Sequence, residues 1–307
     1  MNFESIIIIR DKTRLEQLIE RFNSKAQAKF YIESSGGDFN YLEQEHHQFY
    51  ASLEILKTSV PKGLKLKVIQ RSFLPTYIFT ETDVIVVIGQ DGLVANTAKY
   101  VNGLPIVGIN PDMERYDGIL LKHRPEAFSG LMKQMMNGPF STIQVTMAKA
   151  TLNDGQTLLA FNDFYIGADS HVSSRYKISF EDREEQQSSS GIIVSTGAGS
   201  TGWLSSVFNM ANNINIHHHR NPDLYSNILE WNADQLIFVV REPFLSKMSQ
   251  TTIGYGIITK EAPLTIESQM PTKGIIFSDG IEADYLNFNS GNTVEISIAD
   301  EKANLVI

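Results

Sequence analysis

The sequence predicts two domains, an N-terminal α/β domain on a parallel sheet and a C-terminal β-rich, sandwich-like domain. In the first half of the 307 residues, uniformly apolar runs such as VIVVI at 84–88 alternate with helical patterns. Such runs are typical of parallel strands that are covered on both faces. From about Ile143, short runs of alternating polarity are separated by turn signals such as NDG at 153–155. We place the boundary near NGPF at 137–140.

The expected domains are therefore 1–138 and 139–307, and the last residues of the chain can return to the first domain. SIIIIR at 5–10 predicts the first strand, and Thr13 and Glu16 have the spacing of a capping box that starts a helix. The other elements expected in the first domain are a helix over 43–58, strands at 64–70, 84–88 and 104–109, and a helix over 125–136. In the second domain, the polar stretch EDREEQQSSS at 181–190 predicts an exposed connection.

The composition limits the function classes. No apolar run approaches the roughly 20 residues of a membrane helix, and the IIII run near the N-terminus lacks the flanks of a signal peptide. With no cysteine, disulfides, thiolate metal sites and a cysteine nucleophile are excluded, and the cytoplasm is the predicted compartment. A net charge of -9 disfavours binding to nucleic acid. We expect neither a nucleic acid nor a membrane as a partner.

The first candidate site is the turn GQDG at 89–92, which lies between an apolar strand and a helical pattern. A strand, a glycine turn and a helix start in succession present backbone N–H groups and the positive end of a helix dipole to an anion. The turn is neither a Walker A loop nor G-x-G-x-x-G. Asp91 within it has two interpretations: a functional carboxylate beside bound phosphate, or a residue that only caps the turn.

The second candidate site is GIIVSTGAGSTGW at 191–203. Gly197, Gly199 and Gly202 satisfy the dinucleotide fingerprint G-x-G-x-x-G, but no second strand with a terminal acidic residue follows about 20 residues later. We therefore reject a Rossmann site. The glycines and the hydroxyls around them are expected to contact a ligand at one face of the β-rich domain.

These two motifs, in this order, resemble those of the NAD kinase family over nearly the whole chain. The family's Gly-Gly-Asp-Gly turn is matched by residues 89–92, and the following GINP by 108–111. An Asn-Glu pair is matched by Asn162 and Asp163, and a Thr-Pro-Thr-Gly-Ser-Thr-Ala-Tyr motif by 196–203. A late Asp-Gly is matched by Asp279 and Gly280.

The resemblance implies a NAD kinase-like fold and a phosphotransferase that uses ATP, or polyphosphate, and Mg²⁺ to phosphorylate the adenosine ribose 2′-hydroxyl of NAD. It further implies a homo-oligomer. Asp91 would be the catalytic carboxylate. The residues expected to bind phosphate and nucleotide are Gly89, Gln90, Gly92 and Asn110. Those expected to bind the acceptor NAD are Asn162, Asp163, Ser190, Thr196, Gly199, Ser200, Thr201 and Trp203. No metal ligand is assigned.

The chain departs from the family pattern at several positions. Gln90 and Leu93 replace a glycine and a threonine at the first turn, and Ala198 and Trp203 replace a hydroxyl residue and a tyrosine in the second motif. Ser190 stands where an acidic residue normally precedes the second motif. These departures leave two alternatives open: a kinase of another sugar or lipid hydroxyl, and a noncatalytic nucleotide-binding protein.

Overall fold

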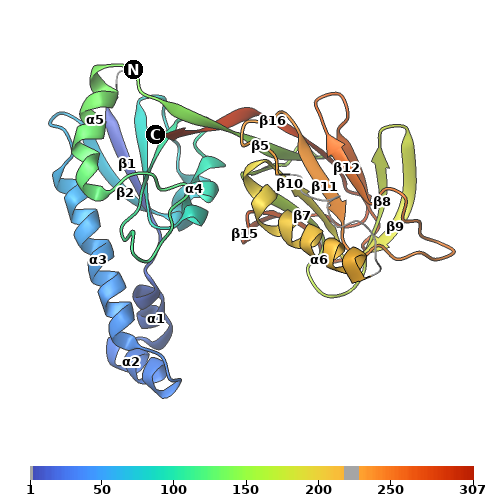
Figure 1. The fold of residues 1–307 in the computed structure, drawn as a ribbon, viewed down its shortest axis with the longest axis horizontal. Helices are drawn as coiled ribbons and strands as arrows, with labels where there is room; N and C mark the ends of the chain where they lie inside the picture. The colour runs from blue at the N-terminus through green and yellow to red at the C-terminus, as the bar shows by residue number, and fades with distance from the viewer. Residues whose placement is uncertain (1–2, 218–227) are drawn as a thin grey trace. The chain divides into compact units, whose positions relative to one another are not determined.

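The computed structural model describes residues 3–217 and 228–307, and its chain divides into two compact units (Figure 1). Unit 1 holds the residues up to Ile143 together with Asn304–Ile307, and unit 2 holds Gln144–Ala303. The chain passes from one unit to the other within β5 (Thr142–Leu152) and again within β16 (Thr293–Val306). The last four residues therefore belong to the same unit as the first strand.

Unit 1 is built on a parallel sheet with the strand order β2-β1-β3-β4. The strands are β1 (Ser5–Arg10), β2 (Lys65–Gln70), β3 (Asp83–Ile88) and β4 (Pro105–Ile109). The end of β16 adds to this sheet, because Asn304 and Leu305 pair in parallel with Pro105 and Ile106 of β4. The parallel sheet expected from the buried apolar runs is confirmed.

Helices cover both faces of this sheet. On one face, α3 (Phe39–Thr58) and α5 (Phe128–Asn137) bury apolar side chains against alternate residues of the strands, and α4 (Asp91–Ala98) packs on the other face. The capping box expected at Thr13 and Glu16 starts α1 (Arg14–Phe22). A helix that the sequence analysis did not identify, α2 (Lys25–Ser34), packs with α1 against the start of α3. Two short 3₁₀ helices, Arg71–Thr76 and Pro125–Ala127, complete the unit.

Unit 2 contains two sheets that share one core. The first sheet is antiparallel, with the order β12-β11-β10-β7-β14-β15. Its strands are β7 (Asp163–Ala168), β10 (Ile192–Ser195), β11 (Leu236–Val240), β12 (Tyr255–Ile258), β14 (Gly274–Ser278) and β15 (Ile281–Asn287). The second sheet contains β6 (Thr157–Ala160), β8 (Ser174–Phe180), β9 (Arg183–Ser189) and β13 (Leu264–Ser268) with parts of β5 and β16. Helix α6 (Trp203–His217) packs on the first sheet, on the face away from the shared core.

The exposed connection expected at residues 181–190 is wrong, because most of this stretch forms β9. Along β9, Glu185, Gln187 and Ser189 are buried, and the residues between them are not. The Glu185 carboxylate accepts hydrogen bonds from the Thr252 hydroxyl at 2.6 Å and the Ile253 amide at 2.9 Å. Buried polar groups are tolerated when they are hydrogen-bonded, so a polar sequence can form an inward-facing strand.

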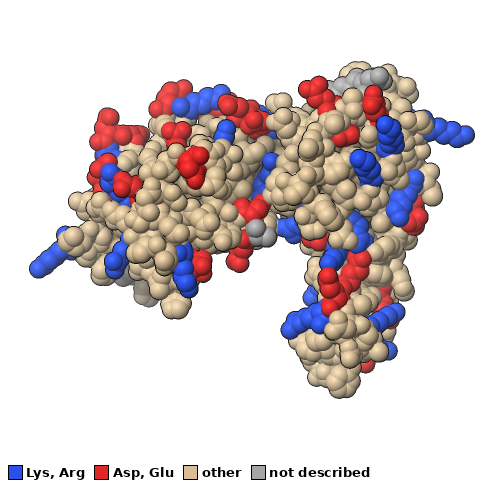
Figure 2. Space-filling model, turned by 180° about the vertical axis from the view of Figure 1, so that it is seen from behind, with Lys and Arg blue, Asp and Glu red and all other residues tan. Residues whose placement is uncertain are grey.

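Two further observations concern the surface. None of the helices in the described part of the chain has the length and hydropathy needed to cross a bilayer. On the face drawn in Figure 2, basic and acidic side chains are interspersed over the described residues.

Candidate active site

The GQDG turn follows β3 at the carboxyl edge of the parallel sheet. β1 pairs with β2 on one side and with β3 on the other. The chain therefore moves to one side of β1 to form β2 and then crosses to the opposite side to form β3 and β4, so the strand order reverses at β1. The register places Arg10 of β1 opposite Ile88 of β3, so the turn begins beside the end of β1. In open α/β sheets, ligands bind at this edge where the strand order reverses.

The local geometry of the turn suits an anion. Gly89 has φ +151°, a conformation that L side chains rarely adopt, and α4 begins two residues later at Asp91. The first-turn amides of a helix have no intrahelical acceptor, and the helix dipole is positive at this end. Gln90 and Gly92 are exposed and Gly89 is partly exposed. The turn can therefore offer backbone N–H groups to phosphate oxygens.

The Asp91 carboxylate already has two hydrogen-bond partners. Its Oδ2 accepts from the amide of Ile119 at 3.0 Å, and its Oδ1 accepts from the amide of Leu120 at 2.8 Å. Both donors belong to the segment after β4, so Asp91 holds that segment rather than capping its own turn. Each carboxylate oxygen can accept a second hydrogen bond. A ligand hydroxyl or a metal ion could therefore still be bound by the same carboxylate.

Asn110, the other predicted phosphate-site residue, is buried and engaged in this segment. Its Nδ2 donates to the Tyr116 carbonyl at 2.9 Å, and its Oδ1 accepts from the Asp112 amide at 3.0 Å. Gly118, at φ +64°, packs so closely that a Cβ would lie 2.4 Å from Asn110 Nδ2. In this structure the Asn110 amide shapes the 110–121 loop, meaning residues 110 to 121 between β4 and Lys122.

In unit 2, the second glycine motif and Asn162 are in direct contact. The Thr196 hydroxyl donates to the Phe161 carbonyl at 2.6 Å and accepts from the Gly199 amide at 3.2 Å, and the Thr196 amide donates to the Asn162 carbonyl at 2.9 Å. A Cβ on Gly199 would lie 2.1 Å from the Asn162 carbonyl oxygen, so only glycine fits there. The hydroxyl of Ser200 donates to the Gly197 carbonyl at 2.7 Å. Thr196 and Ser200 thus shape the turn, whereas Thr201 is exposed.

The Asp-Gly pair identified in the sequence anchors this region. Asp279 and Gly280 have φ +56° and +69° and form the hairpin turn between β14 and β15. The Asp279 carboxylate accepts hydrogen bonds from the amides of Phe161 at 3.1 Å and Asn162 at 2.6 Å. It therefore fixes the backbone from which the side chains of Asn162 and Asp163 project.

Asp163 is the titratable group with the most unusual environment in this region. Burial raises its pKa from the ordinary 3.8 to about 7, and the negative charge of Asp279 adds to the shift. Along β7, Phe164 points into the shared core, so Asp163 and Tyr165 lie on the opposite face. Carboxyl groups that titrate near neutrality are found most often at functional sites.

The same face carries an aromatic pair and a cation. Tyr165 stacks on Trp203 with ring centres 5.9 Å apart and planes at 11°, and the Arg241 guanidinium carbon lies 5.3 Å from the Trp203 ring centre. The Ser190 carbonyl accepts from the Tyr165 hydroxyl at 3.4 Å and from Arg241 Nη1 at 3.5 Å. Tyr165 therefore contacts both Ser190 and Trp203, and Asp163 lies on the same face of β7.

Some residues of these regions were missed in the sequence analysis. Tyr165 could have been found, since it lies two residues after Asp163 and strand alternation places both on one face. Arg241 and Tyr116 carried no local signal, because their partners are distant in the sequence.

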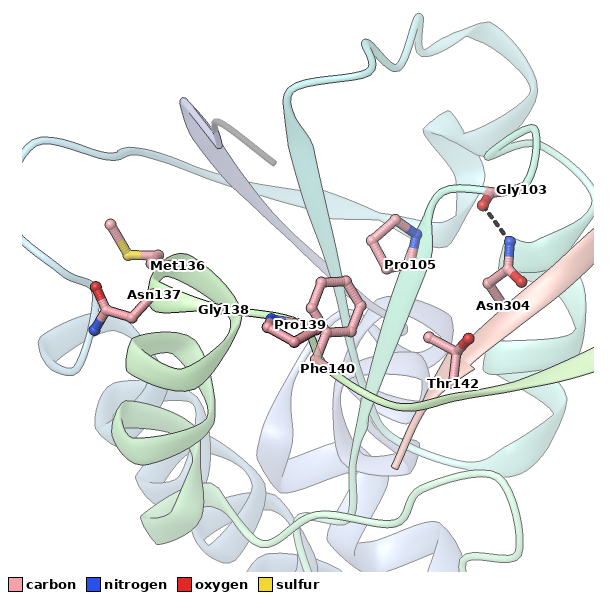
Figure 3. A pocket seen from close by; sticks show the side chains of 9 residues that line it. All are labelled: Gly103, Pro105, Met136, Asn137, Gly138, Pro139, Phe140, Thr142 and Asn304. Atoms are coloured by element: carbon pink, nitrogen blue, oxygen red, sulfur yellow. Dashed lines mark hydrogen bonds between the residues drawn. The ribbon is translucent and has the colours of Figure 1, made fainter.

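A separate cavity in unit 1 contains none of the predicted site residues. Figure 3 shows its lining, which includes Pro105, Phe140, Thr142 and Asn304, and its volume is about 580 Å³. Within the described ranges, no group of three or more His, Cys, Asp or Glu is arranged to hold a metal ion. A site supplied by one carboxylate and substrate phosphates is still compatible with Mg²⁺, which usually takes only one or two protein carboxylates beside phosphate.

No family model matches the chain, but the known proteins that are similar to this chain are NAD kinases. It is 22% identical to NAD kinase 2, mitochondrial, of Xenopus tropicalis, over 97% of this chain and 89% of that protein. It is 29% identical to the NAD kinase of Chlorobaculum tepidum, over 41% of this chain and only 44% of that protein.

Solved structures agree in fold. The NAD kinase of Archaeoglobus fulgidus in complex with ATP superposes with a TM-score of 0.56 at 15% identity, covering 99% of this chain and 93% of that one. Yeast NADH kinase complexed with NADH superposes with a TM-score of 0.60 at 12% identity, covering 100% and 84%. These likenesses confirm the two-domain α/β and β architecture. The resemblance to NAD kinases that the sequence motifs indicated is thus found again over nearly the whole chain, at 22% identity, and in the fold.

Proposed function

We propose that the protein is a phosphotransferase that moves the terminal phosphoryl group of ATP, or of polyphosphate, to the 2′-hydroxyl of the adenosine ribose of NAD. The observation that carries this proposal is the GQDG turn, which places a carboxylate at the start of α4 and at the carboxyl edge of the sheet. Backbone amides there suit phosphate, and the carboxylate suits a hydroxyl. Relatives named as NAD and NADH kinases supply the choice of acceptor.

The proposed roles follow from the chemistry of phosphoryl transfer. The acceptor hydroxyl oxygen forms a bond to the γ-phosphorus while the bond from that phosphorus to the bridging oxygen of ADP breaks. Asp91 orients the hydroxyl and takes its proton, and the amides near Gly89 and Gly92 bind the phosphates. When bound, Mg²⁺ would neutralise phosphate charge, with Asp91 as the protein group available to it. Asn162, Asp163 and Trp203 would bind the acceptor.

The test is NADP formation by purified protein supplied with ATP, Mg²⁺ and NAD, with polyphosphate as the second donor. We expect turnover that requires the metal. A protein that binds nucleotide but forms no phosphorylated product would contradict the proposal and favour the noncatalytic alternative.

A second acceptor class is favoured by the surroundings of Ser190. Where the family motif has an acidic residue, this chain has serine, and the Arg241 guanidinium lies beside its carbonyl. A cation at this position favours an acceptor that carries an anionic or neutral group there. Labelled ATP with a panel of sugar, lipid and dinucleotide acceptors distinguishes this alternative from NAD.

Asn162→Ala is expected to raise the KM for the acceptor by about 2- to 13-fold and to leave the donor KM nearly unchanged. One hydrogen bond to a neutral partner contributes about 0.5–1.5 kcal/mol. The fold should survive, since the hydrogen bonds of Asn162 described above use its backbone. Asn153→Ala is the control, because Asn153 only joins two turns of unit 2. Unchanged kinetics in a folded Asn162→Ala protein would argue against this role.

Acceptor binding is expected to quench or shift the tryptophan fluorescence, and Trp203→Phe should abolish that response. Trp203 is partly exposed and already stacks on Tyr165, so a planar ring of the ligand could extend the stack. Trp231 is the other tryptophan of the chain, and a Trp231→Phe variant should keep the full response. A Trp203→Phe protein that responds like the parent would remove the stacking role.

A homo-oligomer and a cytoplasmic location are also part of the proposal. Sedimentation of the purified protein measures the first. Fractionation of cells measures the second against the mitochondrial location in the name of the Xenopus relative.

A further inference from the structure

Helices α1 and α2 form a cleft that none of the roles described above uses. The two helices lie together at one end of α3 (Figure 1), and the cleft, which is within unit 1, has a volume of about 610 Å³. Its larger lining side chains are Arg21 and Phe22 at the end of α1 and Phe30 and Tyr31 of α2. Along α2 the lining positions are 26–27, 30–31 and 34, which recur every four residues and therefore share one side of the helix.

The local sequence explains why this side of α2 is exposed. Helix α1 ends before Asn23, which has φ +60°, and the Ser24 side chain caps the start of α2. Another side of α2 is used for packing, because Ala28 is buried with residues of α1 and α3. Phe30 is left 75% exposed and Tyr31 40% exposed. These two rings therefore lie outside the core of unit 1.

Arg21 lies beside the aromatic rings of the cleft. Its guanidinium carbon is 5.2 Å from the ring centre of Phe22 and 5.7 Å from that of Tyr31, which are both distances of a cation–π contact. The Phe22 and Tyr31 ring centres are themselves 4.5 Å apart. In the described part of the chain, Arg21 has no hydrogen-bond or ion-pair partner. The N–H donors of its guanidinium group are therefore available to a ligand.

The charges around the cleft favour a ligand with an anionic group. The lining contains Arg21 but no carboxylate, although the chain as a whole has a net charge of -9. Each acidic residue between positions 13 and 44 already has a polar partner, and these residues are Glu16, Glu20, Glu33, Asp38 and Glu43. A carboxylate brought by a partner would thus supply the counter-ion that Arg21 lacks.

The stability of the helices does not explain this arrangement. A cation in the last turn of α1 interacts favourably with the helix dipole, and single exposed apolar residues are common on protein surfaces. Neither effect requires two exposed aromatic rings, a cation in contact with one of them and a cleft at the same place. Tyr, Phe and Arg are enriched at protein–protein interfaces, where Tyr and Arg packed in pockets often contribute most of the binding energy.

We propose that the cleft of Arg21, Phe22, Phe30 and Tyr31 binds a short segment of another protein that presents a large apolar side chain and, within one helical turn of it, a carboxylate. The apolar side chain enters the cleft beside the aromatic rings, and the carboxylate pairs with the Arg21 guanidinium. Because one short segment buries little area, the association is transient. This inference goes beyond the proposed function, since none of the four residues belongs to the candidate active site.

Selection from a random peptide library tests this chemistry without knowledge of the partner. The purified protein is the bait, and the enriched peptides are then synthesised and titrated against it by fluorescence polarisation. We expect these peptides to share a large apolar residue with Asp or Glu within one helical turn, and to bind more weakly as the salt concentration is raised. A selection that enriches no such pattern would overturn the proposal.

Matched variants locate the binding. Phe30→Ala and Arg21→Glu change the cleft, and both side chains are exposed, so both proteins should fold. We expect each change to weaken peptide binding by about tenfold or more, as at a central interface residue. Two controls should bind within about twofold of the parent. Phe73→Ala changes an exposed phenylalanine elsewhere in unit 1, and Arg14→Glu makes the same charge change at the start of α1.

Each result decides one part of the proposal. Parental affinity in Phe30→Ala would show that the peptides bind elsewhere and would rule out the cleft as their site. Weakened binding in Phe30→Ala but not in Arg21→Glu would contradict the role of the carboxylate. Sedimentation of the parent and of Phe30→Ala tests a further occupant. A self-association that this substitution abolishes would show that a second copy of the chain covers the cleft, and another protein would then be the wrong partner.

Discussion

Asp91→Asn is expected to lower kcat by about 10²–10⁴-fold, the usual contribution of a general base. The change removes the negative charge while nearly preserving the shape of the side chain. Nucleotide affinity should not fall in parallel, since a carboxylate close to phosphates repels them in the absence of metal. Steady-state kinetics and metal-free nucleotide titrations on the same protein measure both quantities.

This variant also has a structural effect that must be separated from the catalytic one. Asparagine can accept from only one of the Ile119 and Leu120 amides, so the other loses its partner and the melting temperature should fall. Kinetics are therefore measured well below the melting transition. Tyr116→Phe is the matched control, because it removes the hydrogen bond from the same loop to Glu45 and keeps the Asp91 carboxylate. Equal losses of kcat in the two variants, or near-parental kcat in a folded Asp91→Asn protein, would remove the catalytic role.

Asp163→Asn is expected to stabilise the protein at pH 8 and to have little effect near pH 4. The pKa of Asp163 is about 7 in the folded protein and near 3.8 when unfolded, so the native state holds the proton more tightly between these values. Stability therefore falls as pH rises through this window, and the loss is complete above pH 7. This pKa difference corresponds to a loss of up to about 4 kcal/mol in the free energy of unfolding at pH 8. An asparagine at this position stays neutral at every pH, so the variant avoids this loss of stability.

Denaturant unfolding of parent and variant between pH 4 and 8 measures this difference. Asp234→Asn is the control with the opposite sign: Lys302 lowers the pKa of Asp234, so its pairing stabilises the protein at neutral pH and is lost on acidification. A stability difference for Asp163→Asn that does not change with pH would show that the carboxyl titrates normally. A confirmed effect would mean that the chain retains a destabilising carboxyl, which is typical of residues kept for function.

The sequence predicted the helices and strands that are determined by residues close together in the chain. β3, α4 and β4 follow from apolar periodicity and glycine breaks, and the start of α1 follows from the capping box at Thr13. β9 was missed because its inward residues are polar, and their partners near Thr252 and Ile253 lie far along the chain. A sequence pattern cannot show that a buried glutamate is satisfied.

The candidate site likewise contains some residues that a local motif reveals and others that only the folded chain brings together. The glycine turn and the second motif were visible as motifs, and Gly199 is required because its position touches the Asn162 carbonyl. Glu45 and Tyr116 are 71 positions apart and share no motif, so only the folded chain brings them together. The pKa of Asp163 could not be predicted either, because it depends on burial and on the charge of Asp279, which is 116 positions away in the sequence.

The pairing of Asn304 and Leu305 with β4 has a consequence for the order of synthesis. A ribosome makes the rest of unit 1 before any of unit 2, yet the strand that covers the β4 edge emerges only after all of unit 2. Until then the nascent sheet has an unpaired edge of apolar residues, including the buried Ile106. Such an edge is prone to pair with other chains, so co-translational chaperone contact should matter most for this protein during the synthesis of its second half.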